Sequence, residues 1–288
     1  MVTELTKIGA ALTVGGALGA AATSLFATQR ALRSSATAAA SAHHPPLTAT
    51  STATDAPPPT PLPPTATALP KLFIYDHCPF CVRARMIFGL KQVPHELVFL
   101  ANHDEATPIG LVGAKQAPIL LPPGGAAAFP ESMEIVRFVD AHYGGAVLLH
   151  ESAGREDIKQ WIKDSAECFR LLYHPRFHAA PFAEFAQRAS REYYRAKKEK
   201  SIGSFLDALA RTPELVAEAN AHLERLAQLF HSNRSVNAAL SYDDIDVFGR
   251  LRGLTLVKDL KWPPKLREYV DFMAEAADVP LLDAMAQY

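Results

Sequence analysis

The spacing of apolar residues divides the chain beyond residue 70 into two parts. Short apolar and aromatic runs predict strands at residues 72–75, 95–100, 117–121 and 126–129. Apolar side chains at helical spacing predict helices at residues 82–91 and 131–143. Because strands and helices in this order build a small two-layer sandwich, we expect an α/β domain over residues 71–143.

Beyond residue 154 the apolar positions follow only the helical period, as in Ile158, Trp161, Ile162 and Ser165. This pattern predicts an all-helical second domain over residues 154–288, with Gly144 and Gly145 as the hinge. Ser241 followed by Asp244 is the signature of a helix start, in which each residue hydrogen-bonds the other's backbone. Such a cap contributes about 1 kcal/mol to stability.

The first 70 residues have a different composition, with only two acidic residues, Glu4 and Asp55. Residues 8–27 are uncharged, and arginines and serines follow them, which is typical of an organellar transit peptide. We therefore expect a targeting or anchor segment at 1–44 and a disordered Pro/Thr/Ala-rich linker at 45–70. The expected location is a mitochondrion or plastid. The alternatives are membrane association through residues 8–27, a secretory signal, and an untargeted tail on a cytoplasmic protein.

The overall charge and the cysteine count narrow the function. The 288 residues carry a formal net charge of −1, so no basic field favours nucleic acid as a partner. Three cysteines are too few for the disulfide framework of a small secreted protein. Cys168 has apolar neighbours and is interpreted as a small buried hydrophobe rather than a redox thiol.

The chemistry is expected at Cys78-Pro79-Phe80-Cys81, between the first predicted strand and helix. A cysteine at a helix N-terminus is stabilised as a thiolate by unpaired N–H groups and the helix dipole. Pro79 suits the first helical position, and Cys81 is close enough to form a disulfide with Cys78. A metal site using His77 and both cysteines would lack a fourth ligand, so no metal is expected. A glutathione-ligated iron–sulfur cluster and a structural disulfide are the weaker alternatives.

Residues 71–91, KLFIYDHCPFCVRARMIFGLK, resemble the start of the glutaredoxin 2 family, the glutaredoxins with a glutathione-transferase-like architecture. The resemblance continues through VGAKQAPIL at 112–120, PESMEIVRFVD at 130–140 and LSYDDIDVFGRLRGLTLV at 240–257. It covers essentially all of residues 71–288 and none of the first 70. It implies a thioredoxin-like N-terminal domain, an all-α glutathione-transferase-like C-terminal domain, and glutathione as reductant.

The resemblance also implies a glutathione site. Pro118 would be cis, with the backbone of Ala117 pairing with the peptide as a strand would. Glu131 and Ser132 would hold the γ-glutamyl end, although Ser132 could instead be only an N-cap. Lys115 and Gln116 are candidates for the glycine carboxylate. The chain departs from the family in having Ala117 for the usual Val and Phe80 for the usual Tyr.

The expected activity is a glutathione-dependent disulfide oxidoreductase, in which Cys78 attacks glutathionylated or disulfide-containing proteins. Cys81 or a glutathione would then resolve the mixed disulfide. One alternative is a glutathione transferase or dehydroascorbate reductase on the same architecture. Conjugating enzymes of this kind generally use Ser or Tyr, so two cysteines weigh against a transferase. Another alternative is a redox-sensitive membrane-associated protein of the chloride intracellular channel kind, which usually has Ser where this chain has Cys81.

Overall fold

The computed structural model describes residues 68–286, so the predictions for residues 1–44 and for most of the linker lie outside the described residues. Its sheet contains β1 (Lys71–Ile74), β2 (Glu96–Phe99), β3 (Ile119–Leu121) and β4 (Phe129–Pro130) in the order β2-β1-β3-β4. β1 pairs parallel with β2 and antiparallel with β3, which pairs antiparallel with β4. Each of these four strands overlaps one of the four ranges predicted from the sequence.

The fourth strand is shorter and later than predicted. The prediction placed it at residues 126–129, but only Phe129 of that range pairs, together with Pro130. Ala126 and Ala127 lie in the preceding loop, where they are exposed and pair with no strand. Small alanines give a weak signal for a buried strand, and this boundary was therefore wrong.

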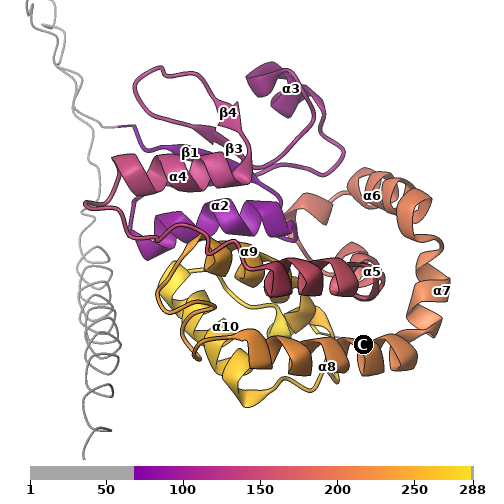
Figure 1. Cartoon of the computed structure of the whole chain (residues 1–288). Coiled ribbons are helices and arrows are strands. Elements are labelled where there is room, and N and C mark those ends of the chain that lie inside the picture. Colours follow the sequence, from indigo (N-terminus) through magenta and orange to yellow (C-terminus); the bar gives the residue numbers. More distant parts are fainter. Residues whose placement is uncertain (1–67, 287–288) are drawn as a thin grey trace, which may run out of the picture. The chain divides into compact units, whose positions relative to one another are not determined.

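Three helices accompany the sheet: α2 (Pro79–Leu90), α3 (Ala106–Val112) and α4 (Ser132–His142). α2 and α4 pack against each other on one side of the sheet (Figure 1). α3 was not predicted from the sequence. Its only buried residue is Pro108, and a proline and Gly110 within seven residues both disfavour a helix.

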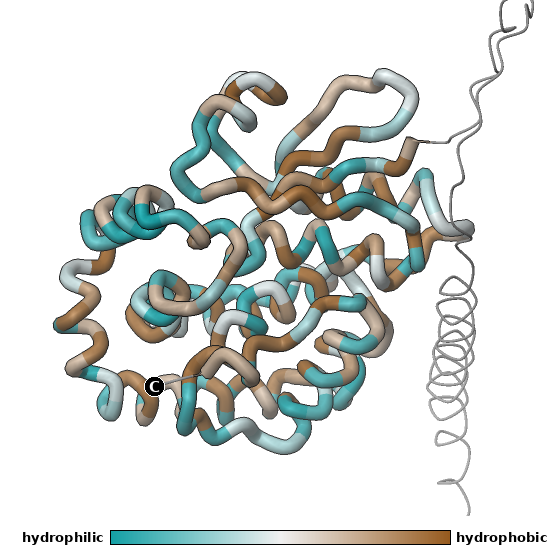
Figure 2. The backbone as a smooth tube through the Cα atoms, turned by 180° about the vertical axis from the view of Figure 1, so that it is seen from behind, coloured by the Kyte–Doolittle hydropathy of each residue, from teal (hydrophilic) through white to brown (hydrophobic). Residues whose placement is uncertain are grey.

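The rest of the described chain is helical. Its α-helices are α5 (Glu156–Ala179), α6 (Arg188–Ile202), α7 (Phe205–Ala210), α8 (Thr212–Leu229), α9 (Tyr242–Leu251) and α10 (Pro264–Ala277). Short 3₁₀ turns lie at Ala183–Phe185, Arg252–Leu256 and Asp283–Met285. α5 contacts α6, α7 and α8. Figure 2 shows the strands as mainly hydrophobic and α6 as mainly hydrophilic. The polar character of α6 agrees with its exposure, since only Ser190 and Tyr194 of this helix are buried.

The predicted helix start at Ser241 is present. The backbone N–H of Ser241 donates to Asp244 Oδ2 at 2.8 Å, and its hydroxyl donates to the same oxygen at 3.1 Å. Asp244 also accepts the backbone N–H of Val236 at 2.8 Å. This carboxylate therefore begins α9 and fixes the loop before it.

α2 joins the sheet-bearing half to the helical half, because it also packs against α9 and α10. Two glycines allow this close approach. A β-carbon on Gly89 would lie 1.7 Å from the carbonyl oxygen of Ala277, and one on Gly249 would lie 2.8 Å from that of Pro79. The start of α2, where Cys78 lies, is thus held directly against the helical half.

The structure confirms the predicted architecture, a small α/β part with a mixed sheet followed by an all-helical part. Strands within residues 68–286 occur only up to Pro130. No helix in this range combines the length and the apolar character needed to cross a bilayer.

Candidate functional site

Cys78 is the residue immediately before α2, and its carbonyl accepts the backbone N–H of Val82 at 2.9 Å. Pro79 occupies the first helical position, as predicted. Cys78 is half-buried, whereas Cys81 is 1% exposed and accepts the backbone N–H of Tyr75 at 3.4 Å. Both are free thiols. The motif therefore offers one accessible sulfur with a second, buried sulfur beside it.

The two thiols differ in acidity. A hydrogen bond from the Cys81 thiol is the largest cause lowering the pKa of Cys78 to about 6. Burial opposes this shift, whereas His77 and the backbone N–H groups of Phe80 and Cys81 favour it. Burial raises the pKa of Cys81. Since a group with a pKa of 6 is about 90% ionised at pH 7, Cys78 is the thiol of the pair that is mainly ionised at neutral pH.

His77 connects this motif to the helical half. Its Nδ1 lies 2.7 Å from Glu184 Oε1, and its backbone N–H donates to the same oxygen at 3.0 Å. Burial alone would raise the pKa of Glu184, but the hydrogen bond and charge of His77 outweigh it, so that the pKa is lowered. The His77 ring also packs among aromatic rings, those of Tyr75, Phe177, Phe182, Phe185 and Tyr194.

Arg252 holds the residue on the other side of His77. Its side chain is 2% exposed and donates to the carbonyl of Asp76 at 2.5 Å and to Asp76 Oδ1 at 2.9 Å. A third bond goes to the carbonyl of Pro280 at 2.8 Å. The loop carrying Cys78 is therefore fixed by two charged groups from the helical half, Glu184 and Arg252.

The residues expected to bind glutathione form two neighbouring segments. The Ala117–Pro118 peptide bond is cis, as the resemblance implied, and Ala117 lies just before β3. Glu131 precedes α4 with a φ of 76°, a conformation that is unusual for a residue with a side chain and is often found at functional sites. Ser132 is 5% exposed at the first helical position. The alternative that Ser132 is only an N-cap is wrong, because Glu131 holds that position.

Lys115 and Gln116 precede this cis bond. Lys115 donates to the carbonyl of Asn102 at 2.7 Å, and its ammonium lies 3.8 Å from the centre of the Tyr193 ring. It also lies 3.8 Å from a carboxylate oxygen of Glu105. Lys115 is therefore engaged with its own chain, and its role towards a glycine carboxylate stays a prediction. Gln116 is half-buried beside it.

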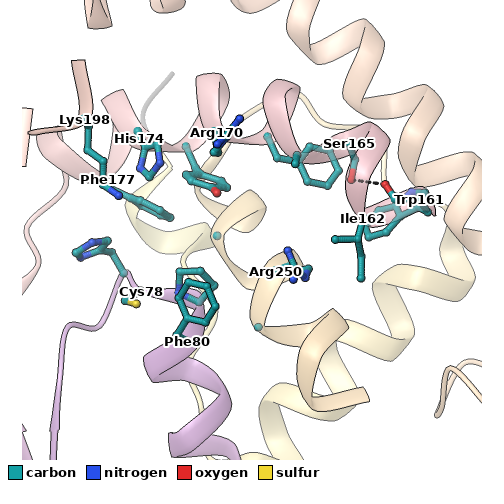
Figure 3. A pocket seen from close by; sticks show the side chains of 17 residues that line it. Cys78, Phe80, Trp161, Ile162, Ser165, Arg170, His174, Phe177, Lys198 and Arg250 are labelled. Carbon is teal, nitrogen blue, oxygen red and sulfur yellow. Dashed lines mark hydrogen bonds between the residues drawn. The ribbon is translucent and has the colours of Figure 1, made fainter. Parts of the chain in front are cut away.

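A cavity of about 380 Å³ opens beside Cys78 on the side of the helices. Figure 3 shows it between Cys78 and Phe80 of the motif, α5 and α9. Its wall is aromatic, with the rings of Phe80, Trp161, Phe169, Tyr173 and Phe177. None of the six residues predicted to bind glutathione lines it. The cavity and the segments predicted to bind glutathione are therefore two different surfaces of the protein.

Sequence reasoning missed the Arg and Lys residues that line this cavity, Arg170, Lys198 and Arg250, and also Glu184. They lie on helices and a 3₁₀ turn far along the chain, and no local motif marks them.

Cys168 is buried as expected. Its thiol donates a hydrogen bond to the carbonyl of Leu215 at 3.3 Å, and burial raises its pKa to about 12. Between residues 68 and 286, no three His, Cys, Asp or Glu side chains gather as metal ligands.

Fold and site together define a two-part protein of glutathione-transferase-like architecture with a Cys-x-x-Cys pair at the start of its first described helix. Family models agree: the N-terminal domain of glutathione S-transferases matches residues 77–142, and the C-terminal domain of glutaredoxin 2 matches residues 157–286. Glutaredoxin 2 of Escherichia coli K12 is 42% identical over 216 residues, covering 75% of this chain and 99% of that protein. The chain therefore belongs to the glutaredoxin 2 family.

Solved structures extend the comparison. Glutaredoxin 2 from Salmonella typhimurium, in complex with glutathione, superposes with a TM-score of 0.73 at 43% identity and covers 76% of this chain and 100% of that chain. A glutathione S-transferase from Ceriporiopsis subvermispora reaches a TM-score of 0.53 at 15% identity, with coverage of 75% and 96%. The second likeness shows the fold alone.

Proposed function

We propose that the protein is a glutathione-dependent thiol–disulfide oxidoreductase that uses Cys78 as its nucleophile. The observation that carries this proposal is the pair of unequal thiols: a half-exposed sulfur with a pKa of about 6 beside a buried one with a raised pKa. An attacking thiol works best when its pKa is near the ambient pH, and a low pKa also makes it a good leaving group. Both properties suit a sulfur that forms a mixed disulfide and is released from it in every catalytic cycle.

In the first step the Cys78 thiolate attacks the glutathionyl sulfur of a mixed disulfide. The substrate's S–S bond breaks, an S–S bond forms between Cys78 and glutathione, and the substrate leaves as a thiolate that takes a proton from solvent. In the second step a glutathione thiolate attacks the Cys78 mixed disulfide, which releases glutathione disulfide and restores the Cys78 thiolate. With an intramolecular protein disulfide, the Cys78 thiolate first forms an S–S bond with one substrate sulfur and the other substrate sulfur leaves as a thiolate. Cys81 then loses its proton and attacks the Cys78 sulfur, so that a Cys78–Cys81 disulfide forms and the substrate is released as a dithiol. Two glutathiones reduce this disulfide and leave as glutathione disulfide.

The bound glutathionyl group is proposed to lie along the cis-Pro segment. The backbone of Ala117, next to Pro118, would pair with the peptide, and Glu131 and Ser132 would hold its γ-glutamyl end at the start of α4. Lys115 and Gln116 would face its glycine carboxylate. The Salmonella relative that contains glutathione supports glutathione as the ligand.

The test is a glutathione-coupled disulfide reductase assay on the purified full chain, with Cys78→Ser as the decisive variant. We expect Cys78→Ser to abolish turnover and Cys168→Ser to preserve it, because Cys168 is buried away from the motif. Substantial turnover by Cys78→Ser would refute the assignment. Conjugation or dehydroascorbate reduction without disulfide reduction would favour the transferase and dehydroascorbate reductase alternatives.

The first 44 residues are proposed to direct the protein to a mitochondrion or plastid. Their basic, serine-containing composition with almost no acidic residues supports this proposal. A fluorescent fusion of residues 1–44 should accumulate in one of these organelles. A diffuse cytosolic signal would contradict targeting, and a signal that resists carbonate extraction would favour a membrane anchor.

A further inference from the structure

Helix α6 of the helical half contacts the loop that leads into α3 (Figure 1). The hydroxyl of Tyr193 donates to Glu105 Oε1 at 2.8 Å, and His103 Nδ1 lies 2.7 Å from the hydroxyl oxygen of Ser190. Lys115, which follows α3 in the chain, lies against the same tyrosine, with its ammonium 3.8 Å from the centre of the ring. α6 is therefore in direct contact with a residue of the predicted glutathione site.

The ammonium of Lys115 has hydrogen-bonding capacity to spare. It donates to the carbonyl of Asn102 at 2.7 Å, and one face of it is covered by the Tyr193 ring. Within residues 68–286 this carbonyl is its only hydrogen-bond acceptor. Since an ammonium carries three N–H donors, Lys115 keeps donors for a ligand.

Glu105 carries a carboxylate that could use these donors. Its Oε1 lies 3.8 Å from Lys115 Nζ, which exceeds the range of about 2.7–3.2 Å for an N–H···O hydrogen bond. The same oxygen accepts the hydroxyl of Tyr193 at 2.8 Å. Burial and, after it, this hydrogen bond raise the pKa of Tyr193, so the hydroxyl keeps the proton that it donates. The carboxylate is therefore bound by Tyr193 rather than by Lys115.

The position of Lys115 in the chain indicates which ligand would use its free donors. Gln116, Ala117 and the cis Pro118 follow it directly. A glutathionyl peptide that pairs with the backbone of Ala117 would have one end close to Lys115. Because hydrogen bonds between an ammonium and a carboxylate are roughly twice as strong as neutral ones, that end is expected to be the glycine carboxylate.

We propose that Tyr193 is a positioning residue for glutathione recognition. Its ring orients the Lys115 ammonium and its hydroxyl holds Glu105 away, so that Lys115 binds the glycine carboxylate of the glutathionyl group. The proposal rests on the function proposed above, and it gives a residue of the helical half control over the affinity of the glutathione site. Tyr193 acts through Lys115 and does not itself touch the ligand.

The test follows the formation of the Cys78–glutathionyl mixed disulfide in the full chain carrying Cys81→Ser. The substrate is a glutathionylated peptide, compared with the same peptide in which the glycine carboxylate of the glutathionyl group is an ethyl ester. We expect the half-saturating concentration of the ester to be roughly tenfold higher or more, the effect of losing a hydrogen bond to a charged group. Lys115→Gln should remove this preference for the free acid.

Tyr193→Phe keeps the ring and removes the hydroxyl. Glu105 can then approach Lys115 and compete with the glycine carboxylate, so the preference for the acid should fall roughly two- to fivefold, the effect of a partly exposed ion pair. The maximal rate should stay the same. Adding Glu105→Gln to Tyr193→Phe removes the competing carboxylate and should restore the preference. Adding Glu192→Gln instead should not, because this exposed carboxylate of α6 pairs with Arg188.

The outcomes separate this proposal from the proposed function. If the mixed disulfide forms but Tyr193→Phe keeps the full preference, or loses it without recovery on adding Glu105→Gln, the role of Tyr193 is refuted and the oxidoreductase function stands. A preference that survives Lys115→Gln refutes it as well. If no mixed disulfide forms at Cys78, both proposals fail. A general loss of stability would affect both substrates alike, so it cannot produce the expected result.

Discussion

His77 Nδ1 lies 2.7 Å from Glu184 Oε1, and this contact connects residues 107 positions apart. Through it, the carboxylate of Glu184 contacts the residue that precedes Cys78 in the chain. Glu184 is 1% exposed, and its Oε2 is buried without a hydrogen-bond partner among the described residues. His77 is in turn one of the groups that lower the pKa of Cys78. Glu184 is therefore a positioning residue for the thiolate.

We expect Glu184→Gln to raise the pKa of Cys78, because the variant weakens the two contacts that hold the His77 ring and backbone next to Cys78. A loss of about 1 kcal/mol of charge stabilisation corresponds to a rise of roughly 0.7 pH units. The measurement is the pH dependence of Cys78 alkylation in the folded variant. Glu192→Gln, which removes an exposed carboxylate on α6, is the control. An unchanged midpoint in Glu184→Gln would limit this residue to a structural role.

The hydrogen bond from the Cys81 thiol is the largest cause of the low Cys78 pKa, and this makes a second prediction. Alkylation of Cys78 in the unmodified protein should rise with a midpoint near pH 6. Cys81→Ala should move the midpoint upwards more than Cys81→Ser, whose hydroxyl can still donate a hydrogen bond. Identical midpoints in the two variants would show that the Cys81 thiol is not the donor.

The same pKa predicts how stability depends on pH. The pKa of Cys78 in the folded protein lies below the ordinary thiol value of 9.0, so ionisation stabilises the fold. This contribution is complete above about pH 9 and is lost as the pH falls through 6. The test compares the free energy of unfolding of the reduced protein with that of Cys78→Ala between these two pH limits. The free energy of unfolding of the reduced protein should exceed that of the variant by the largest amount at the alkaline limit.

Substitutions at the start of α4 test the proposed glutathione site. Ser132→Ala and Glu131→Gln should raise the Michaelis constant for glutathione roughly 10- to 150-fold, the effect of losing a hydrogen bond to a charged group. The pKa of Cys78 should not change, because these residues would contact the end of glutathione away from its sulfur. Glu134→Gln, exposed on the same helix, is the control. An unaltered Michaelis constant in both variants would exclude Glu131 and Ser132 from the site.

The close approach of α2 and α10 gives a prediction about stability. Gly89→Ala places a β-carbon 1.7 Å from a backbone oxygen of Ala277, so the helices must separate. The expected loss is about 1–3 kcal/mol, the usual cost of overpacking, measured by denaturant unfolding. Gly110→Ala is the matched control, because nothing lies within 4 Å of its β-carbon. Equal stability of the two variants would contradict tight packing at Gly89.

The sequence predicted those features that depend on local signals. The Cys78 motif stands between a strong apolar strand and a helix whose first residue is a proline, so its geometry follows from neighbouring residues alone. The start of α9 at Ser241 was predicted for the same reason, because its capping partner, Asp244, is three residues away. By contrast, α3 contains helix-disfavouring residues and forms against the rest of the fold, and no local signal revealed it.

The environment of the thiolate could not be predicted in this way. Glu184, Lys198 and Arg250 lie on elements that reach Cys78 only through packing of the helical half. In the sequence nothing distinguishes these three residues from the other charged residues of helices and turns. Ser132 shows the same limit at shorter range: its residue type suited an N-cap, but Glu131, with a φ of 76°, is the N-cap of α4 and Ser132 is its first helical residue. Such positions require three-dimensional information.

The measurement that most directly tests the central claim is the site of glutathione attachment. The full-length Cys81→Ser protein is incubated with glutathione disulfide, and the protein and its peptides are analysed by mass spectrometry. The account predicts one glutathionyl group, attached to Cys78 and removed by added glutathione. A protein that stays unmodified, or that carries its glutathionyl group on Cys168, would contradict it.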